Sequence, residues 1–592
     1  MSAAPAAEIV PRCPELCPDG RQTIMDAAQV SRHRTLVGVQ QKKLIRIRQE
    51  KLTRPPLSTP SEKLAESLKV LAKLQRQHAG AIRASDLSRT HQERLLKQGF
   101  LLRVMNGWLI PSRPDNVEGE STAWYASYWQ FCAVYLRSRF KTQWCLSPEQ
   151  SLSIHAGSWT VPKQLVVRAP RARNRITNLP HGTSLFDLRA TLPTGRDREV
   201  FEDLQVFSAE CALIECSVHF FSSNPTDVRA VMLAIRDASG LLARLLDGGR
   251  TVIAGRLAGA FRNVGRDRIA DDIVKTMSAA GYAVRETDPF ADRPLLTPYG
   301  RETSPYVNRI RLLWQAMRQP VIDRFPDAPG LPRDVKAYLK RVNDVYVTDA
   351  YHSLSIEGYQ VTPELIERVR TGSWNPERNE SDREQRNAMA ARGYWLAFQS
   401  VQRSVEKVLR GKNAGEVADD DHGAWYRELF APSVTTGLLK PSDLAGYRNG
   451  QVYIRKSMHV PLNPEAVRDA MPTLFDLLRE EANPAVRVVL GHFFFVYIHP
   501  YMDGNGRIGR FLMNLMMAAG GYPWIVIPVG DRSRYMAALE RASVGTDIAP
   551  FTDFLAALTR HGLAGDTPPS VPNKEGLAAT NELVAFDEEI GI

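Results

Sequence analysis

The stretch His499-Pro-Tyr-Met-Asp-Gly-Asn-Gly-Arg-Ile-Gly-Arg510 decides how the C-terminal half of this chain is interpreted. Its glycines let backbone N–H groups converge on an anion without obstruction by side chains. The apolar run that follows, Arg507 to Met517, predicts a buried helix whose N-terminus faces that anion. A glycine loop that leads into such a helix predicts a binding site for a polyphosphate.

Four side chains of this stretch carry the predicted chemistry. His499 can take up a proton near neutral pH, so it is the candidate general base. Asp503 supplies a hard oxygen ligand of the kind that Mg²⁺ prefers when phosphates complete its coordination. Arg507 and Arg510 offer planar, permanently charged groups to phosphate oxygens.

These residues resemble the signature of the Fic family, His-Pro-Phe-x-Asp/Glu-Gly-Asn-Gly-Arg-x-x-Arg, with Tyr501 in place of Phe. The resemblance implies an all-α Fic core over residues 300–565 that transfers AMP from ATP, with Mg²⁺, to a Ser, Thr or Tyr hydroxyl of an unknown target protein. It implies that His499 is the base and that Asp503 holds Mg²⁺. The implied ATP-binding residues are Gly504, Asn505, Gly506, Arg507, Arg510, Tyr535 and Met536. Related Doc-type kinases carry a lysine where Gly506 stands, so Gly506 favours AMP transfer, while other nucleotide donors stay open.

A second stretch, Tyr351-His-Ser-Leu-Ser-Ile-Glu-Gly-Tyr359, resembles the inhibitory motif of class II Fic proteins. The resemblance implies that Glu357 pairs with Arg510 and makes ATP bind unproductively, with Ser353 and Gly358 completing the motif. A carboxylate there would occupy an arginine N–H that could otherwise donate to a phosphate, and its charge would repel the phosphate. In some relatives the same glutamate positions water for the removal of AMP, so a de-AMPylating enzyme is an alternative.

Between these motifs, residues 446–455 alternate apolar side chains after an Asn-Gly turn, which predicts a β-hairpin. It resembles the Fic flap, which pins the target segment by strand addition. The residues predicted to dock the target are Val452, Tyr453, Ile454 and Arg455. An ordinary surface hairpin is the alternative.

Residues 61–115 predict a winged helix-turn-helix: a first amphipathic helix, short helices over 84–87 and 89–98, and a hairpin over 100–110. The third helix would face DNA. Its predicted contact residues are Arg89, Thr90, His91, Gln92, Arg94 and Lys97. A winged helix that binds protein is the alternative.

This N-terminal segment resembles the winged helix of AbiEi-type antitoxins. Residues 116–295 alternate strands such as 164–168 with helices such as 210–221 and 225–239, and loosely resemble the α/β domain that follows in those antitoxins. The resemblance implies a DNA operator as a partner and a toxin–antitoxin or phage-defence setting. A DNA-binding regulator that uses the Fic fold as an ATP sensor is the alternative to an enzyme.

The length and composition of the chain bear on the number of domains, the partners and the location in the cell. With 592 residues and 44% hydrophobic composition, the chain predicts several globular domains of mainly α character. The net charge of +11 and pI near 9.3 are compatible with nucleic acid. The absence of an eighteen-residue apolar run and of a signal pattern predicts a cytoplasmic protein without a membrane partner.

The remaining predictions concern the chain ends and the cysteines. Residues 1–60 predict a mobile basic arm, in which 40–54 is a basic run, and residues 566–592 predict a C-terminal tail. Six unevenly spaced cysteines suit reduced thiols. The oligomeric state stays open, and a homodimer is one assembly considered.

Overall fold

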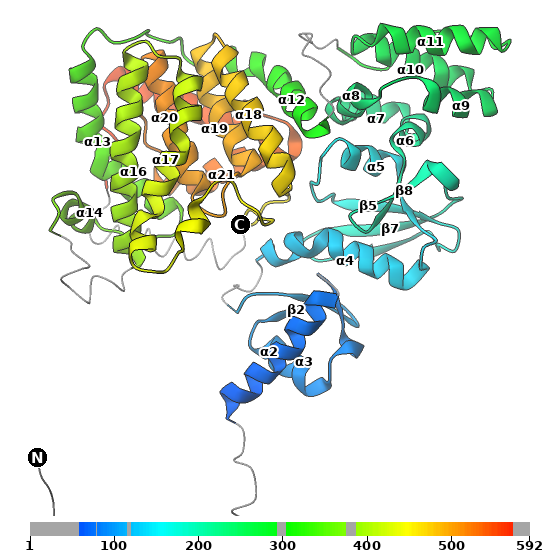
Figure 1. Ribbon diagram of the computed structural model, residues 1–592, viewed down its shortest axis with the longest axis horizontal. Helices are drawn as coiled ribbons and strands as arrows, with labels where there is room; N and C mark the ends of the chain where they lie inside the picture. The colour runs from blue at the N-terminus through cyan, green and yellow to red at the C-terminus, as the bar shows by residue number, and fades with distance from the viewer. Residues whose placement is uncertain (1–58, 78–79, 115–119, 293–303, 374–385, 572–592) are drawn as a thin grey trace, which may run out of the picture. The chain divides into compact units, whose positions relative to one another are not determined.

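The computed structural model describes residues 59–77, 80–114, 120–292, 304–373 and 386–571. By their internal contacts the residues form two compact units, Met1–Lys69 and Val70–Ile592. The described residues are mainly α-helical and include three small sheets (Figure 1), which confirms the mainly α, multidomain fold class. The bounds of the five predicted domains stay predictions. The predicted arm and tail lie almost wholly outside the described residues.

The first unit is described only where helix α2 (Pro60–Gln77) begins. The second unit opens with a three-stranded antiparallel sheet of order β1-β3-β2. Its elements are β1 (Ile82–Arg83), η1 (Ala84–Asp86), α3 (Arg89–Lys97), β2 (Leu101–Met105) and β3 (Trp108–Pro111). The helix predicted over 84–87 is a three-residue 3₁₀ turn, because Leu87 is already extended. Helix α3 begins where the Ser88 hydroxyl accepts a hydrogen bond from the His91 amide.

A four-stranded sheet follows, in the order β4-β5-β7-β6. Only β5 and β7 pair in parallel. The elements of this region are α4 (Thr122–Phe140), β4 (Cys145–Leu146), α5 (Pro148–His155), β5 (Gln164–Ala169), β6 (Arg175–Asn178), β7 (Ser184–Arg189), η2 (Gly195–Asp197), β8 (Arg198–Phe201) and β9 (Leu204–Phe207). The strand predicted over 164–168 is therefore present, and its buried side chains share a hydrophobic core with aromatic residues of α4.

The next region is helical, with a core of its own. Its helices are α6 (Ala209–Glu215), α7 (Val218–Ser223), α8 (Pro225–Ala234), α9 (Ser239–Asp247), α10 (Thr251–Asn263) and α11 (Asp267–Ala279). The single helices predicted over 210–221 and 225–239 are wrong. Cys216 and Ser217 adopt extended backbone angles and end the first, and Ile235 does the same for the second. The four described cysteines are buried free thiols.

The C-terminal body packs helices around the largest hydrophobic core. Its helices are α12 (Pro305–Ile322), α13 (Val335–Ile356), α14 (Pro363–Arg370), α16 (Arg386–Leu409), α17 (Ala414–Thr435), η3 (Pro441–Leu444), α18 (Pro464–Glu480), α19 (Pro484–Ile498), α20 (Asn505–Gly520), η4 (Val529–Asp531), α21 (Arg532–Gly545) and α22 (Ala549–Ala564). Helices α16 to α20 lie alongside one another (Figure 1). The predicted buried helix after the glycine loop is α20. None of the described helices combines the length and apolarity that crossing a bilayer requires.

The β-hairpin predicted over 446–455 is wrong, because this segment has no strand pairing in the structure. Side chains link its two arms instead of a backbone ladder. Gln451 Nε2 donates to the Pro461 carbonyl at 2.8 Å, and an Arg448 guanidinium N–H donates to the Leu462 carbonyl. Pro461 has no N–H to offer to a ladder. We call residues 446–462 the flap segment.

Candidate functional site

The glycine loop joins α19 to α20 through a backbone that its own sequence prescribes. Pro500 disfavours helical geometry at His499, which ends α19 in the left-handed region with φ 56°. The Asn505 side chain then closes the loop: its Oδ1 accepts from the Tyr501 amide at 2.9 Å, and its Nδ2 donates to the Tyr501 carbonyl at 2.8 Å. This reciprocal pair closes the loop over residues 501–505, at the start of α20.

Two glycines let the start of α20 pack closely. Gly504 has φ +80°, and a Cβ there would lie 2.9 Å from Phe430. A Cβ on Gly506 would lie 2.3 Å from Glu357 Oε1. The first N–H groups of a helix have no partners within the helix, so the Glu357 carboxylate lies where an anion would bind.

The imidazole of His499 is held as a neutral base. Its Nδ1 lies 3.0 Å from the Val496 carbonyl, which can only accept, so Nδ1 carries the proton and Nε2 keeps a lone pair. Burial lowers the pKa of His499 to about 4, and the nearby Arg448 charge acts in the same direction. The ring is therefore unprotonated at neutral pH, which general-base chemistry requires.

Arg510 is buried and engaged on one side. Its Nε donates to Ser353 Oγ at 2.9 Å, and its Nη2 donates to the Ser353 carbonyl at 3.0 Å and to Glu357 Oε1 at 2.7 Å. Its Nη1 has no hydrogen-bond partner among the residues that the structure describes. The structure thus brings together Ser353, Glu357 and Arg510, and leaves one buried donor of Arg510 available.

Glu357 stays ionised in this setting. Burial raises the pKa of its carboxyl. The positive charges of Arg510 and then Arg507 lower that pKa by more, so the net pKa lies below its ordinary value. Glu357 caps the C-terminus of α13, and Gly358 follows it at φ +81°. Gly358 suits this position because the left-handed region carries little penalty for glycine.

Arg507 and Asp503 are contrasting neighbours. The Arg507 side chain is 2% exposed and its guanidinium lies 5.2 Å from the ring centres of both Tyr359 and Phe430. The Asp503 side chain is 65% exposed, and its Oδ2 lies 3.4 Å from Arg507 Nη2. Both residues line a cavity of about 880 Å³ together with residues of α16, α17 and the flap segment.

Asp503 was predicted to hold Mg²⁺, and its surroundings suit a metal ion that arrives with phosphates. No cluster of three or more His, Cys, Asp or Glu side chains suited to a metal occurs in the described part of the chain. Mg²⁺ commonly uses one or two carboxylates and completes its octahedron with phosphate and water oxygens. One exposed carboxylate beside Arg507, which can hold phosphate, fits that donor set.

The structure positions the other predicted ATP residues less directly. Tyr535 is 1% exposed, and its hydroxyl lies 2.7 Å from His492 Nε2. Met536 is partly buried and packs against the main core. Both lie on α21, and the nucleotide contact predicted for them stays a prediction.

Of the residues predicted to dock a target, Val452, Tyr453 and Ile454 are partly exposed. Arg455 instead forms an ion pair with Glu120, with Nε 2.9 Å from Oε1. The predicted DNA-facing residues lie on α3: Arg89, Thr90 and Lys97 are exposed, whereas His91, Gln92 and Arg94 are partly buried. Arg89 pairs with Glu93 at 2.7 Å.

Arg448 is a site residue to which sequence reasoning gave no role. Its Nε donates to the His499 carbonyl at 2.8 Å, its Nη1 donates to the Gly450 carbonyl at 2.9 Å, and its amide donates to the Pro500 carbonyl at 2.9 Å. It therefore ties the glycine loop to the flap segment. The local sequence carries no signal for this role, because arginine is ordinarily exposed, whereas Arg448 is 2% exposed.

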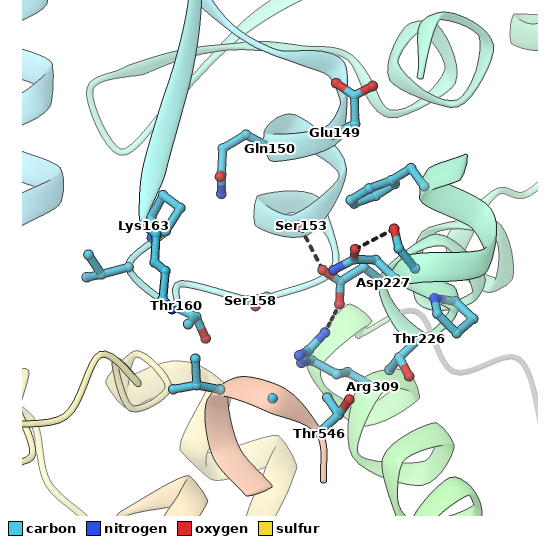
Figure 2. A pocket seen from close by; sticks show the side chains of 18 of the residues that line it. Glu149, Gln150, Ser153, Ser158, Thr160, Lys163, Thr226, Asp227, Arg309 and Thr546 are labelled. Carbon is cyan, nitrogen blue, oxygen red and sulfur yellow. Dashed lines mark hydrogen bonds and ion pairs between the residues drawn. The ribbon is translucent and has the colours of Figure 1, made fainter. Parts of the chain in front are cut away.

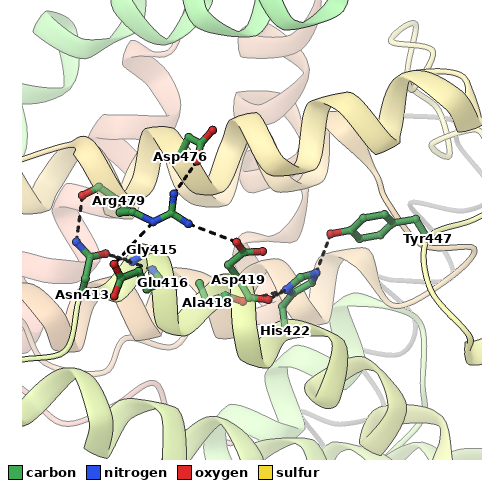
Figure 3. A network of polar contacts seen from close by, with 9 residues as sticks. All are labelled: Asn413, Gly415, Glu416, Ala418, Asp419, His422, Tyr447, Asp476 and Arg479. Atoms are coloured by element: carbon green, nitrogen blue, oxygen red, sulfur yellow. Dashed lines mark hydrogen bonds and ion pairs between the residues drawn. The ribbon is translucent and has the colours of Figure 1, made fainter.

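The start of the flap segment is also fixed, through the network in Figure 3. His422 Nδ1 donates to the Ala418 carbonyl at 2.9 Å, so Nε2 can accept from the Tyr447 hydroxyl at 3.0 Å. Next to it, Arg479 of α18 lies within 3.4 Å of Asp419 of α17. This network joins α17, α18 and the residue that precedes Arg448.

A second cavity, of about 750 Å³, lies between α5, α8 and α12 (Figure 2). Its most buried charges, Asp227 and Arg309, form an ion pair, and Ser153 Oγ donates to Asp227 at 2.7 Å. Arg309 Nε also donates to the hydroxyl of Tyr497, two residues before His499, at 3.1 Å. These charges are already satisfied by protein groups.

Residues 420–517, which contain the glycine loop, match the model of the Fic/DOC family. Protein adenylyltransferase fic-1 of Caenorhabditis elegans is 28% identical over 228 residues, covering 37% of this chain and 41% of that protein. Protein adenylyltransferase Fic of Nematostella vectensis is 28% identical over 287 residues, covering 48% and 63%. The chain thus spans about half the length of the curated relatives it matches.

Two solved structures are also similar. Fic-1 of C. elegans, residues 134–508, superposes with a TM-score of 0.32 at 20% identity, over 58% of this chain and 93% of that one. A Fic-domain-containing signaling protein from Bacteroides thetaiotaomicron gives 0.31 at 19% identity, over 45% and 100%. At these TM-scores the likeness does not by itself establish a common fold.

Proposed function

We propose that this chain, which matches the Fic/DOC family over residues 420–517 and is similar to Fic protein adenylyltransferases, transfers AMP from ATP to a hydroxyl group of a target protein. The observation that carries the proposal is the state of His499. Its Nδ1 is committed to the Val496 carbonyl and its ring is neutral, so Nε2 is a base beside the start of α20.

In the proposed reaction, His499 Nε2 accepts the proton of the target hydroxyl. The hydroxyl oxygen then forms a bond to the α-phosphorus of ATP, and the bond from that phosphorus to the bridging oxygen breaks, releasing pyrophosphate. The N–H groups at the start of α20 and the Arg507 guanidinium would hold the phosphates in line for this displacement. Mg²⁺ held by Asp503 would neutralise charge that develops on the leaving phosphates.

We further propose that the protein restrains itself through Glu357. The carboxylate lies against Gly506 and occupies one N–H of Arg510, so it competes with a phosphate for the same donors. Its lowered pKa keeps it charged at neutral pH, which adds repulsion against phosphate. ATP would then bind in a pose from which the α-phosphorus is not in line with the hydroxyl.

The experiment is the transfer of label from α-³²P-ATP to protein, with the other nucleotide triphosphates run in parallel. We compare the parent with Glu357→Gly, with Glu357→Gln, which keeps the shape but not the charge, and with Glu357→Gly/His499→Ala. The matched control is Glu364→Gln, an exposed glutamate in the first turn of α14. We expect label to rise in both Glu357 variants, to vanish in the double variant and to stay at the parent level in the control.

Two results would overturn the proposal. Absence of label in every variant while ATP still binds would favour an ATP sensor. Release of AMP from a labelled protein by the parent, lost in Glu357→Gly, would favour the de-AMPylating alternative, in which Glu357 positions water.

For residues 61–115 we propose a winged helix that binds DNA. Support comes from the antiparallel β1-β3-β2 sheet, whose β2–β3 hairpin follows α3, and from the exposed Arg89 and Lys97 of that helix. Binding to duplex DNA should weaken linearly in a log–log plot against salt, and Lys97→Ala should reduce the slope by about 1. Salt-independent or undetectable binding would favour a protein partner. The toxin–antitoxin or phage-defence setting, ATP as partner and a homodimer stay expectations.

A further inference from the structure

The two arms of the flap segment are held in different ways. In the outgoing arm, Gln451–Ile454, the amides of Val452 and Tyr453 have no hydrogen-bond partner among the described residues. In the return arm, residues 455–462, the Lys456 amide donates to Thr122 Oγ1 at 3.0 Å and the Met458 amide donates to Glu540 Oε1 at 2.9 Å. The two amides of the outgoing arm are thus available to a partner strand, whereas these two amides of the return arm are occupied.

The return arm is fastened at the start of α4, in the sheet-containing region. Glu120 has a side chain that is 3% exposed, and it accepts from Arg455 Nε at 2.9 Å and from Thr122 Oγ1 at 2.7 Å. The Thr122 hydroxyl passes the hydrogen-bond chain on to the Lys456 amide. Lys456 adopts φ 59°, a conformation that a non-glycine residue keeps only when its surroundings hold it.

A second set of contacts continues along the arm. The Val161 amide donates to the Met458 carbonyl at 2.9 Å, and Met458 and Val460 pack against the core that contains α4 and β5. His459 Nε2 lies 2.9 Å from the Tyr497 carbonyl, two residues before His499. The return arm therefore connects the region of α4 with the helix that carries the base.

We propose that Glu120 and Thr122 are positioning residues for target docking: they hold the return arm of the flap segment so that an extended target segment adds to the outgoing arm, Gln451–Ile454. The inference rests on the proposed function. A carboxylate buried to this degree is stable only when its partners stay in place, so Glu120, Thr122 and Arg455 act as one unit. Since the outgoing arm has no strand pairing of its own, its position depends on the contacts of Glu120 and Thr122 with the return arm.

The specificity of docking follows from the same geometry. An added strand would pair with one edge only. Successive amides of an extended chain face opposite edges, so the pairing would use the N–H group of Val452 or that of Tyr453. The added strand would lie beside the partly exposed side chains of Val452, Tyr453 and Ile454. The target class is thus an extended segment with a Ser, Thr or Tyr beside residues that can pack on two aliphatic groups and one aromatic ring. Helical target segments are excluded, because their N–H and C=O groups are already paired.

The test uses the full chain carrying Glu357→Gly, to which we add Glu120→Gln or Thr122→Val. Thr122→Ser is the matched control, because it keeps the hydroxyl that Thr122→Val removes. Glu199→Gln, an exposed glutamate of β8, is the control for charge loss. The readouts are protein-bound α-³²P label at several concentrations of a soluble cell extract as acceptor, the affinity for the fluorescent analogue TNP-ATP, and amide exchange over residues 455–459.

For Glu120→Gln and Thr122→Val we expect label at low acceptor concentration to fall about tenfold and to recover as acceptor rises, while TNP-ATP affinity is unchanged. Amide exchange at Lys456 and Met458 should accelerate at least about tenfold. Thr122→Ser and Glu199→Gln should match the Glu357→Gly parent. A general loss of folding would instead lower TNP-ATP affinity as well.

Three outcomes would overturn the inference: unchanged exchange over 455–459, label that falls equally at all acceptor concentrations, or label that rises when the fastening is removed. Failure of the proposed function looks different. In that case the Glu357→Gly parent transfers no label, while the exchange data still decide whether Glu120 and Thr122 hold the flap segment.

Discussion

The glycine loop and the flap segment meet at Arg448, yet they are held by opposite means. The loop is fixed by its own residues, through the reciprocal Asn505–Tyr501 hydrogen bonds and the left-handed angles of His499 and Gly504. The flap segment has no internal ladder and is held by residues far along the chain, such as Glu120 and Glu540.

This difference indicates how the protein divides rigidity and adaptability. Under the proposed function, the base and the phosphate cradle must keep their geometry closely, because a misplacement of about 1 Å costs about a hundredfold in rate. A docking edge must accept segments of varied sequence, so its contacts are better supplied from outside. Arg448 bonds to the carbonyls of both His499 and Gly450 and keeps the two regions in register.

The largest effect should come from removing the base of the loop. In the Glu357→Gly background, His499→Ala should lower label transfer by about 10³-fold, because His499 Nε2 is the proposed acceptor of the proton. Rates of label transfer at saturating ATP measure this, with TNP-ATP affinity showing that the nucleotide still binds. The control is His561→Ala, whose side chain is 73% exposed at the end of α22. Equal rates for the two variants would assign the proton transfer to another group.

The next effect separates the two regions by stability. Asn505→Ala leaves the buried N–H and C=O groups of Tyr501 unpaired and should lower the free energy of unfolding by about 2 kcal/mol. Gln451→Ala removes an exposed link between the flap arms and should change it by less than about 0.5 kcal/mol. Denaturant unfolding compares them, with Asn343→Ala on the exposed face of α13 as control. A larger cost for Gln451→Ala would reverse the comparison.

A double-mutant cycle measures the coupling between Gly506 in the loop and Glu357. A methyl group on Gly506 would lie 2.3 Å from Glu357 Oε1 and should push the carboxylate off Arg510. Gly506→Ala should therefore destabilise the parent by about 1 kcal/mol more than it destabilises the Glu357→Gly variant. Unfolding of the four proteins of this cycle gives the coupling. Additive effects would mean that the Glu357 carboxylate does not rest against the start of α20 in solution.

The smallest expected effect is that of pH near neutrality. The pKa of His499 is lowered from 6.5 to about 4, so the base is already unprotonated and kcat/KM of the Glu357→Gly variant should be flat above about pH 6. The free energy of unfolding should also fall as the pH is lowered. His352, His459 and His492 also have pKa values near 4, so their contribution is complete above 6.5 and is lost as pH falls toward 4. A kinetic acid limb centred near 6.5 would contradict this.

Much of the helical framework was predictable from local patterns. The run after Arg507 is apolar on nearly every side, and it forms the buried helix α20. The β2–β3 hairpin was also predictable, because Asn106-Gly107 stands between two apolar runs. The prediction of one helix over 210–221 was wrong because Ser217 caps the start of a second helix. No periodicity marks the extended residues Cys216 and Ser217.

The prediction of a β-hairpin in the flap segment was wrong for a different reason. Its alternation and its Asn-Gly pair are real hairpin signals, but long-range partners outcompete a two-stranded ladder, which is marginal by itself in water. Thr122 and Glu540 take the amides of the return arm, and Pro461 lacks one. No pattern within residues 446–462 could predict partners more than 80 residues away in either direction.

The sequence by itself determined the conformation of the glycine loop, the position of His499 and the helix behind it, because glycine angles, the proline after His499 and the Asn505 side chain act within a few residues. Only the tertiary structure decided that Glu357 lies against Gly506, that Arg448 joins the loop to the flap segment, and that Glu120 is buried against Arg455. These contacts join residues brought together by helix packing, and their charges are stable in the interior only because the fold supplies each with a partner.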